Sequence, residues 1–179
     1  MPSELLTPGA RVGRYEVIAH LAGGGMGQVY KARDVELDRV VALKVLPRHV
    51  AENPVMVERF RREARSAARL SHKNIVTLYD WGQGDGTWFL ALEFIDGTDL
   101  SRHIVERGRL DAEEAWRVTV QAARALEHAY RQGITHRDIK PSNFLLMRRG
   151  KKFRLKLTDF GLARADHEDD FRVTRDGTT

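Results

Sequence analysis

The first half of the chain alternates between apolar and polar residues over short stretches, which is typical of β-strands. Four such stretches predict strands, at 15–21, 28–33, 40–46 and 88–94. Glycine, aspartate or proline separates them, and these residues favour turns because their backbones adopt the conformations that reverse a chain. We expect the strands to pair as an antiparallel sheet.

Apolar residues at three- and four-residue spacing predict two helices. The first begins at Asn53 and Pro54, which suit the cap and first turn of a helix, and runs to about residue 70. The second runs from a capping-box-like pair, Asp111 and Glu114, to about residue 131, and Gly133 closes it. The expected buried positions are Val57, Phe60, Ala64 and Ala67 in the first helix and Trp116, Ala123, Leu126 and Tyr130 in the second. A short strand pair at 144–146 and 153–157 follows.

The composition is that of an ordinary globular chain. Its 179 residues suffice for one buried domain, or for two small lobes that share a cleft, with 42% hydrophobic and 31% charged residues. The absence of cysteine excludes disulfides, thiol catalysis and thiolate metal sites. The sequence shows neither the pattern of a signal peptide nor a run of apolar residues long enough to span a membrane, so we expect a cytoplasmic location. Any membrane anchor would lie beyond Thr179.

Basic residues exceed acidic ones, which gives a net charge of +5 and a pI near 9.7. Such a balance can indicate nucleic-acid binding through phosphate contacts. The basic residues, however, fall into a helix stripe (Arg61, Arg65 and Arg69) and into a hairpin turn around Gly150. Both are typical of solvated faces, so nucleic acid is not an expected partner.

A glycine-rich segment at 21–29, Leu-Ala-Gly-Gly-Gly-Met-Gly-Gln-Val, joins two of the predicted strands. Glycines allow a backbone to approach a phosphate and to aim several N–H groups at it. A plain flexible hairpin is an equally good interpretation of this segment by itself.

Lys44 lies within a predicted strand, on the same face as apolar residues of that strand. Either this lysine reaches water at a sheet edge, or an anion faces it. Glu63 is a candidate anion because it lies inside the apolar stripe of the first helix, although it could also lie at the wet rim of that stripe. If the helix packs on the sheet, a pair between Lys44 and Glu63 would satisfy both charges and leave a lysine N–H for a phosphate.

Two polar segments of the second half carry groups suited to phosphoryl transfer. In the loop 136–143, Asp138 can accept a hydroxyl proton, Lys140 can neutralise a phosphoryl group and Asn143 can bind a hard cation. Asp159, in Asp-Phe-Gly, follows a predicted strand. Mg²⁺ prefers one or two protein carboxylates together with substrate phosphates, which suits Asp159 and Asn143. Each segment by itself is also compatible with an ordinary surface turn.

In order and spacing, these motifs resemble those of the protein kinase family: the glycine loop, Val-Ala-Leu-Lys at 41–44, the helix glutamate, His-Arg-Asp followed by Asn, and Asp-Phe-Gly. The resemblance implies an α+β fold of two lobes, in which an antiparallel sheet with one helix precedes the first part of a mostly helical lobe. It implies a flank at 1–14, the N-lobe and hinge at 15–95, and a partial C-lobe at 96–179 that ends in the activation segment.

The resemblance also implies a role for each charged residue of the motifs. Lys44 would hold the α- and β-phosphates of ATP, and Glu63 would orient it. Asp138 would be the catalytic base, while Asn143 and Asp159 would bind Mg²⁺.

On the adenine side, the resemblance makes Glu93 and Ile95 the hinge residues whose backbone bonds adenine, with Leu92 gating the pocket behind them. The other implied cofactor-binding residues are Leu21, Ala22, Gly23, Gly24, Gly25, Gly27, Val29 and Ala42. The first glycine of the family's loop is Ala22 here. Because Ala adds only a methyl group, ATP binding should survive this departure.

Lys140, in Asp-Ile-Lys-Pro-Ser-Asn, resembles the serine/threonine branch of the family, which implies Ser and Thr hydroxyls of proteins as acceptors and ATP and Mg²⁺ as cofactors. Residues 13–17 and 31–34 are similar to bacterial, eukaryote-like kinases. Arg137 is similar to its counterpart in kinases that are switched by activation-loop phosphorylation, for which Thr174 is the candidate acceptor.

The chain ends at Thr179, before the Ala-Pro-Glu segment and the later helices of the family. The helix at 111–131 would then lack part of its packing surface, and ordering an unsupported catalytic loop costs about 1–2 kcal/mol per residue. We therefore expect a kinase whose isolated 179 residues transfer phosphate weakly or not at all. A nucleotide-binding kinase remnant or scaffold without turnover is the alternative.

Overall fold

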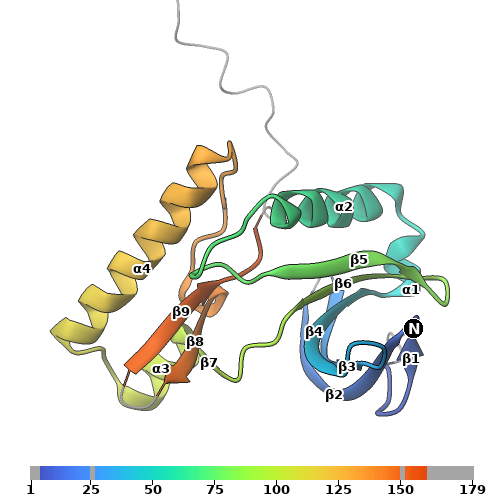
Figure 1. The fold of residues 1–179 in the computed structure, drawn as a ribbon, viewed down its shortest axis with the longest axis horizontal. Helices are drawn as coiled ribbons and strands as arrows, with labels where there is room; N and C mark the ends of the chain where they lie inside the picture. The colour runs from blue at the N-terminus through green and yellow to red at the C-terminus, as the bar shows by residue number, and fades with distance from the viewer. Residues whose placement is uncertain (1–4, 25–26, 150–151, 161–179) are drawn as a thin grey trace, which may run out of the picture.

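The computed structural model describes residues 5–24, 27–149 and 152–160, and arranges them as two antiparallel sheets with helices packed on them (Figure 1). The first sheet comprises β1 (Arg11–Val12), β2 (Tyr15–Gly24), β3 (Gly27–Asp34), β4 (Arg39–Leu46), β5 (Leu78–Gly84) and β6 (Thr87–Glu93), in the order β1-β2-β3-β4-β6-β5. The second sheet comprises β7 (Gly97–Asp99), β8 (Phe144–Arg149) and β9 (Lys152–Leu157), in that order.

The predicted antiparallel sheet is confirmed, since its four predicted strands correspond to β2, β3, β4 and β6. The predicted pair at 144–146 and 153–157 is also confirmed, as β8 and β9. Two strands of the first sheet were not predicted. One is β1, which lies in the predicted flank, and the other is β5, where Asp80, Gly82 and Gly84 disfavour a strand that pairing with β6 nevertheless stabilises.

The first sheet curls until its two ends meet. The hydroxyl of Tyr15 donates to Asp80 at 2.9 Å, and the N–H of Gly13 donates to Asp85 at 2.9 Å. Burial raises the pKa of Tyr15 to about 12, so its hydroxyl keeps the proton that it donates. The curl encloses a core of Val12, Tyr15, Val17, Tyr30, Ala32, Val41, Leu43, Val45, Phe89 and Ala91. Alternation along β4 therefore turns Lys44 away from this core, to the other face of the sheet.

A short helix α1 (Arg48–Ala51) leads to α2 (Pro54–Ala68), which lies along β5 in Figure 1. The predicted cap is confirmed, because the Asn53 side chain accepts from the N–H of Val55 at 3.0 Å. The helix packs on the sheet through a cluster of Leu46, Phe60, Ala64 and Leu90. This contact places the inward face of α2 next to the Lys44 side of β4.

The second half contains α3 (Leu100–Arg107), which was not predicted, and α4 (Ala112–Arg131). The predicted start of α4 is confirmed, since the Asp111 side chain accepts from the N–H of Glu114 at 2.8 Å. Gly133 follows its end with a left-handed φ of +70°. Within the described ranges, none of the helices is long and apolar enough to cross a membrane.

The predicted buried side of α4 is wrong for Trp116, Ala123 and Tyr130, which are exposed, whereas Leu126 is half-buried and packs against the core as expected. Trp116 is 69% exposed and Tyr130 is 79% exposed, whereas Val118, Ala125 and Ala129 are buried against the second sheet. The helix carries two apolar stripes, and the one with small residues packs because it allows the helix to approach the strands closely. The two largest apolar side chains of α4, Trp116 and Tyr130, face outward.

The loop that joins α2 to β5 packs on α4 through two histidines. The rings of His72 and His128 stack with their centroids 5.2 Å apart, and Nδ1 of His72 accepts from the N–H of Asn74 at 3.2 Å. Burial lowers the pKa of His72. The positive groups that act in the same direction are His128, Lys73, Lys156 and Arg124.

Acidification is expected to reduce the free energy of unfolding through His72. Because the folded state resists protonation of this ring, the unfolded chain binds more protons below its ordinary pKa of about 6.5, so stability falls as pH drops through that value. His136, whose pKa is also lowered by burial, acts with the same sign. Urea unfolding measures this effect at about pH 7.5 and 5.5. The free energy of unfolding should fall less between these pH values in His72→Asn than in the wild type. The exposed His49→Asn is the matched control, and an identical pH dependence of wild type and His72→Asn would contradict the prediction.

Candidate active site

Three charged side chains meet at one end of the first sheet. Lys44 from β4 donates to both carboxylate oxygens of Glu63 on α2, at 2.8 and 3.1 Å, and to Asp159, which follows β9, at 3.1 Å. Lys44 is 6% exposed and Glu63 is 3% exposed. The predicted pair is therefore confirmed, and Asp159 is a further partner that the sequence did not indicate.

This cluster joins one ammonium to two carboxylates. Burial opposes the charge on Lys44, but the carboxylates of Glu63 and Asp159 outweigh it and raise the pKa of the lysine. Burial also raises the pKa of Glu63 to about 6, against the attraction of Lys44, so the pair stays charged at neutral pH. The Asp159 side chain is 34% exposed and is the carboxylate of this cluster that a cation can reach.

The residues expected to cover adenine lie on the same face of the sheet as Lys44. In the ladder, Val29 lies directly opposite Lys44, and Ala42 lies opposite Leu92. Residues opposite each other in neighbouring strands share a face, and Ala42 is two positions from Lys44 in its own strand. Val29, Ala42 and Leu92 are half-buried, so the sheet presents a partly open apolar surface beside the lysine.

The glycine-rich segment forms the end of the hairpin of β2 and β3. Its described cofactor-binding candidates in β2 are Leu21, Ala22, Gly23 and Gly24, all exposed. Ala22 pairs with Val29, which in turn pairs with Lys44, so the hairpin end lies on the lysine side of the sheet. Gly25, Gly161 and Thr174 lie outside the described residues.

Gly27 is the glycine that this hairpin requires. A Cβ at Gly27 would lie 2.9 Å from the carbonyl oxygen of Val45, and its φ of +152° is rare for other residues. Gly27→Ala is therefore expected to lower the free energy of unfolding by about 1–3 kcal/mol. Gly24→Ala is the matched control, because nothing lies within 4 Å of its Cβ position. Equal urea midpoints of the two variants would show that the close approach at Gly27 is tolerated.

The predicted hinge begins at Glu93, the last residue of β6. The N–H of Glu93 donates to the carbonyl of Thr77 at 2.8 Å, and its carboxylate accepts from the N–H of Thr77 at 3.2 Å and from Lys156 at 2.6 Å. Protein groups thus engage the side chain of Glu93, which agrees with a role for its backbone rather than its carboxylate. Ile95, two residues further along, is half-buried.

The polar loop after α4 brings three predicted residues together around a 3₁₀ turn, η1 (Pro141–Asn143). The carboxylate of Asp138 lies 2.7 Å from Nζ of Lys140, and Nδ2 of Asn143 donates to it at 3.1 Å. The Lys140 ammonium, assisted by Asn143, holds the pKa of Asp138 below its usual range. Since the amide nitrogen of Asn143 is used here, its amide oxygen is the atom suited to a cation.

This loop is fastened to the strand that ends at Asp159. The N–H of Thr158 donates to the carbonyl of Asn143 at 3.0 Å, and Nε2 of His136 lies 2.8 Å from the carbonyl oxygen of Thr158. His136 also packs on Phe160 with ring centroids 4.6 Å apart. Burial lowers the pKa of His136, so at neutral pH the ring is uncharged and donates through Nε2. These bonds attach the loop of Asn143 to the residue that precedes Asp159. Both residues carry side-chain oxygens of the kind that Mg²⁺ prefers.

Two residues that fasten the strands and loops around the site were not predicted from the sequence. Asn74 is 1% exposed, and its amide donates to the carbonyl of Leu155 at 2.8 Å and to Gln121 at 2.9 Å. Lys156 is 6% exposed and pairs with Glu93. The pattern gave no signal for Lys156, because its strand face is shared with Arg154 and Lys152, whereas Lys44 shares its face with apolar residues.

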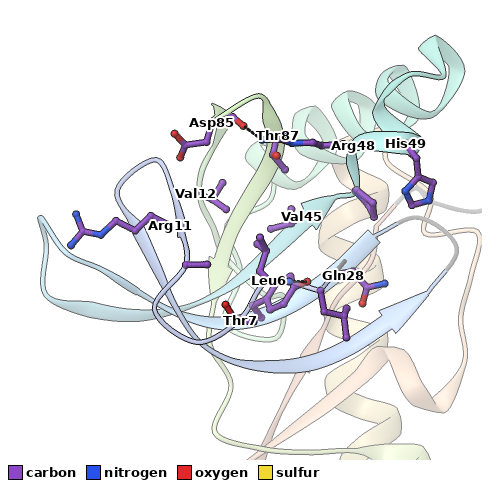
Figure 2. Close-up of a pocket in the computed structure, with 14 residues that line it drawn as sticks. Leu6, Thr7, Arg11, Val12, Gln28, Val45, Arg48, His49, Asp85 and Thr87 are labelled. Atoms are coloured by element: carbon purple, nitrogen blue, oxygen red, sulfur yellow. Dashed lines mark hydrogen bonds between the residues drawn. The ribbon is translucent and has the colours of Figure 1, made fainter. Parts of the chain in front are cut away.

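A cavity of about 470 Å³ lies near the mouth of the curled sheet (Figure 2). It is lined by Val45, Gln28 and residues of the N-terminal segment such as Leu6 and Val12. Val45 points to the opposite face of β4 from Lys44, so this cavity is separate from the charged cluster. The side chains of Arg11 and Asp85 point away from it in Figure 2.

Comparison with known proteins gives a consistent result. The family model "Protein kinase domain" matches residues 15–179. The serine/threonine-protein kinase PrkC of Bacillus subtilis is 42% identical over 153 residues, which cover 86% of this chain and 23% of PrkC. PknA of Mycobacterium tuberculosis is 41% identical over 158 residues, which cover 86% of this chain and 36% of PknA.

Solved structures agree. The crystal structure of the Mycobacterium tuberculosis PknI kinase domain matches with a TM-score of 0.76 at 33% identity, covering 89% of this chain and 64% of that chain. The chain thus spans less than two thirds of the length of these relatives. It belongs to the protein kinase family, as part of a bacterial serine/threonine protein kinase domain similar to those of PrkC and PknA.

Proposed function

We propose that this chain binds Mg-ATP and supplies the nucleotide-handling residues of a kinase that transfers the γ-phosphate of ATP to Ser and Thr hydroxyls of proteins. The observation that carries the proposal is the buried Lys44, held between Glu63 and the more accessible Asp159. A buried ammonium between two carboxylates, beside a half-open apolar face, is suited to a ligand that joins an aromatic ring to phosphates.

In this proposal Lys44 binds the α- and β-phosphates, while Asp159 and the amide oxygen of Asn143 hold Mg²⁺. The cation, when bound, neutralises phosphate charge. The backbone of Glu93 and Ile95 binds the adenine edge. The glycine hairpin covers the phosphates.

Asp138 orients the acceptor hydroxyl and takes its proton. Because Lys140 lowers the pKa of Asp138, this carboxylate is a weak base at neutral pH, suited to accept the proton once bonding to phosphorus has made the hydroxyl acidic. Lys140, whose Nζ lies 2.7 Å from the carboxylate of Asp138, neutralises charge on the transferring phosphoryl group in this proposal. We retain Thr174 as the proposed acceptor of an activating phosphate.

For the isolated 179 residues, the exposed face of α4 favours the second candidate function, nucleotide binding without efficient turnover. Two large apolar side chains on one helix face, Trp116 and Tyr130, are typical of a surface that packs against another segment. Purified residues 1–179 are therefore expected to bind Mg-ATP but to transfer little phosphate to a basic test protein.

Calorimetry with Mg-ATP and transfer of radiolabelled γ-phosphate test the two parts separately. Binding without transfer is the expected result. No binding would overturn the proposed function, and efficient transfer that Asp138→Asn abolishes would show that the isolated chain is already a working enzyme.

A further inference from the structure

A second ion pair, between a buried lysine and a partly exposed carboxylate, lies at the adenine end of the site. Nζ of Lys156, on β9, lies 2.6 Å from the carboxylate of Glu93 and donates to the carbonyl of Ile75 at 3.2 Å. The same carboxylate oxygen accepts from the N–H of Thr77 at 3.2 Å. One lysine thus joins the end of β6, the loop before β5 and the last strand of the second sheet.

The direction of Lys156 follows from its strand. Leu155 and Leu157 enter the second core, so the residue between them points to the opposite face, toward the first half of the chain. Backbone bonds already fasten β9 to the loop, since the N–H of Val76 donates to Leu157 at 2.9 Å and the N–H of Leu157 donates to Asn74 at 2.8 Å. The ion pair is therefore not needed to attach β9.

Stability alone does not account for this pair. Burying the Lys156 ammonium and most of the Glu93 side chain costs desolvation free energy, and an apolar pair of similar size often stabilises a protein equally well or better. What an ion pair adds is direction, because the carboxylate has to meet both Lys156 and the N–H of Thr77. The backbone bond of Glu93 to Thr77 fixes the same residue from its other side.

We propose that Lys156 is a positioning residue for adenine recognition, which acts through Glu93 to hold the hinge backbone in place for the base. Lys156 precedes Asp159 by three residues on the same strand path, so the strand that delivers the cation ligand also positions the adenine end. This inference rests on the proposed function, since it takes the backbone of Glu93 and Ile95 as the groups that bind adenine.

The test compares Mg-ATP with Mg-ITP, whose hypoxanthine reverses the donor and acceptor that adenine presents at this edge. Calorimetry on the wild type should show tighter binding of ATP than of ITP. In Lys156→Met, ATP affinity is expected to fall about tenfold while ITP affinity stays within about twofold, because the lost bonds are those to the adenine edge.

A double variant separates positioning from folding. Glu93→Leu/Lys156→Met removes both charges and is expected to regain the thermal stability that Lys156→Met loses, but not the preference for ATP over ITP. Arg14→Met is the matched control, because it also breaks an ion pair, in another part of the sheet. Nε of Arg14 lies 3.4 Å from the carboxylate of Asp34, which is fully buried. It should lower stability and leave the ATP preference unchanged.

Three outcomes would contradict the positioning role of Lys156. An unchanged preference in Lys156→Met, or a double variant that regains both stability and preference, would overturn the positioning role. Equal binding of ATP and ITP by the wild type would overturn it too, while leaving the phosphate-binding proposal intact. If the wild type binds no Mg-ATP at all, the proposed function fails first and this inference with it.

Discussion

Lys44→Met is expected to weaken Mg-ATP binding roughly 10- to 150-fold, since a hydrogen bond to a charged group contributes about 1.5–3 kcal/mol. The lysine is held by Glu63 and Asp159, so its ammonium is already in place before a ligand arrives. Methionine keeps the length of the side chain but cannot donate to a phosphate. Calorimetry on residues 1–179 measures the change directly.

The same variant is expected to lose stability in a pH-dependent manner. Without Lys44, the buried Glu63 has no cation beside it, and breaking such a buried pair costs about 3–5 kcal/mol. The pKa of Glu63, already about 6, would rise further, and a carboxyl group with a raised folded-state pKa stabilises the fold at low pH and loses that effect as pH rises through the pKa. The free energy of unfolding that Lys44→Met loses relative to the wild type should therefore be smaller at about pH 5.5 than at about pH 7.5.

Lys44→Met/Glu63→Gln distinguishes folding from binding in this cluster. It should regain stability at neutral pH while ATP affinity stays low. The exposed Lys73→Met is a control that should change neither. An ATP affinity of Lys44→Met equal to that of the wild type would remove Lys44 from the proposed site.

Charged residues on apolar faces were the most informative feature of the sequence. Lys44 and Glu63 were predicted to pair because each was too polar for its position, and the structure joins them. The residues of the catalytic loop are close in sequence, so one short turn brings Asp138 to Asn143 as expected. In both cases a local pattern determined which groups had to find a partner.

Features that depend on tertiary shape could not be predicted in the same way. The pattern of α4 contains two apolar stripes, and only the shape of the second sheet decides that Ala125 packs while Trp116 stays outside. The strand β5 forms because β6 pairs with it, against its own composition. Lys156 lies on the polar face of its strand pattern, so its burial could not be predicted from its neighbours, and its partner Glu93 is 63 positions away.

Asp138→Asn is expected to reduce phosphate transfer on the order of a thousandfold while Mg-ATP affinity stays within about twofold, because general base catalysis contributes roughly 10²–10⁴-fold. Asparagine retains an oxygen that can accept from Lys140 and from Asn143, so the loop should keep its arrangement. It cannot take the hydroxyl proton. The effect is therefore expected in the transfer step and not in nucleotide binding.

Transfer is best measured in a chimaera that joins residues 1–179 to the part of the PknI kinase domain that this chain does not cover. Ser142→Ala, an exposed substitution in the same loop, is the matched control and should retain activity. Loss of ATP affinity in Asp138→Asn would mean that the loop had rearranged, and undiminished transfer would show that another group accepts the proton. If Asp138→Asn loses transfer but still binds Mg-ATP, Asp138 acts in the transfer step. Its role then differs from that of Lys44, because the ammonium holds the phosphates whereas the carboxylate acts on the hydroxyl that attacks them.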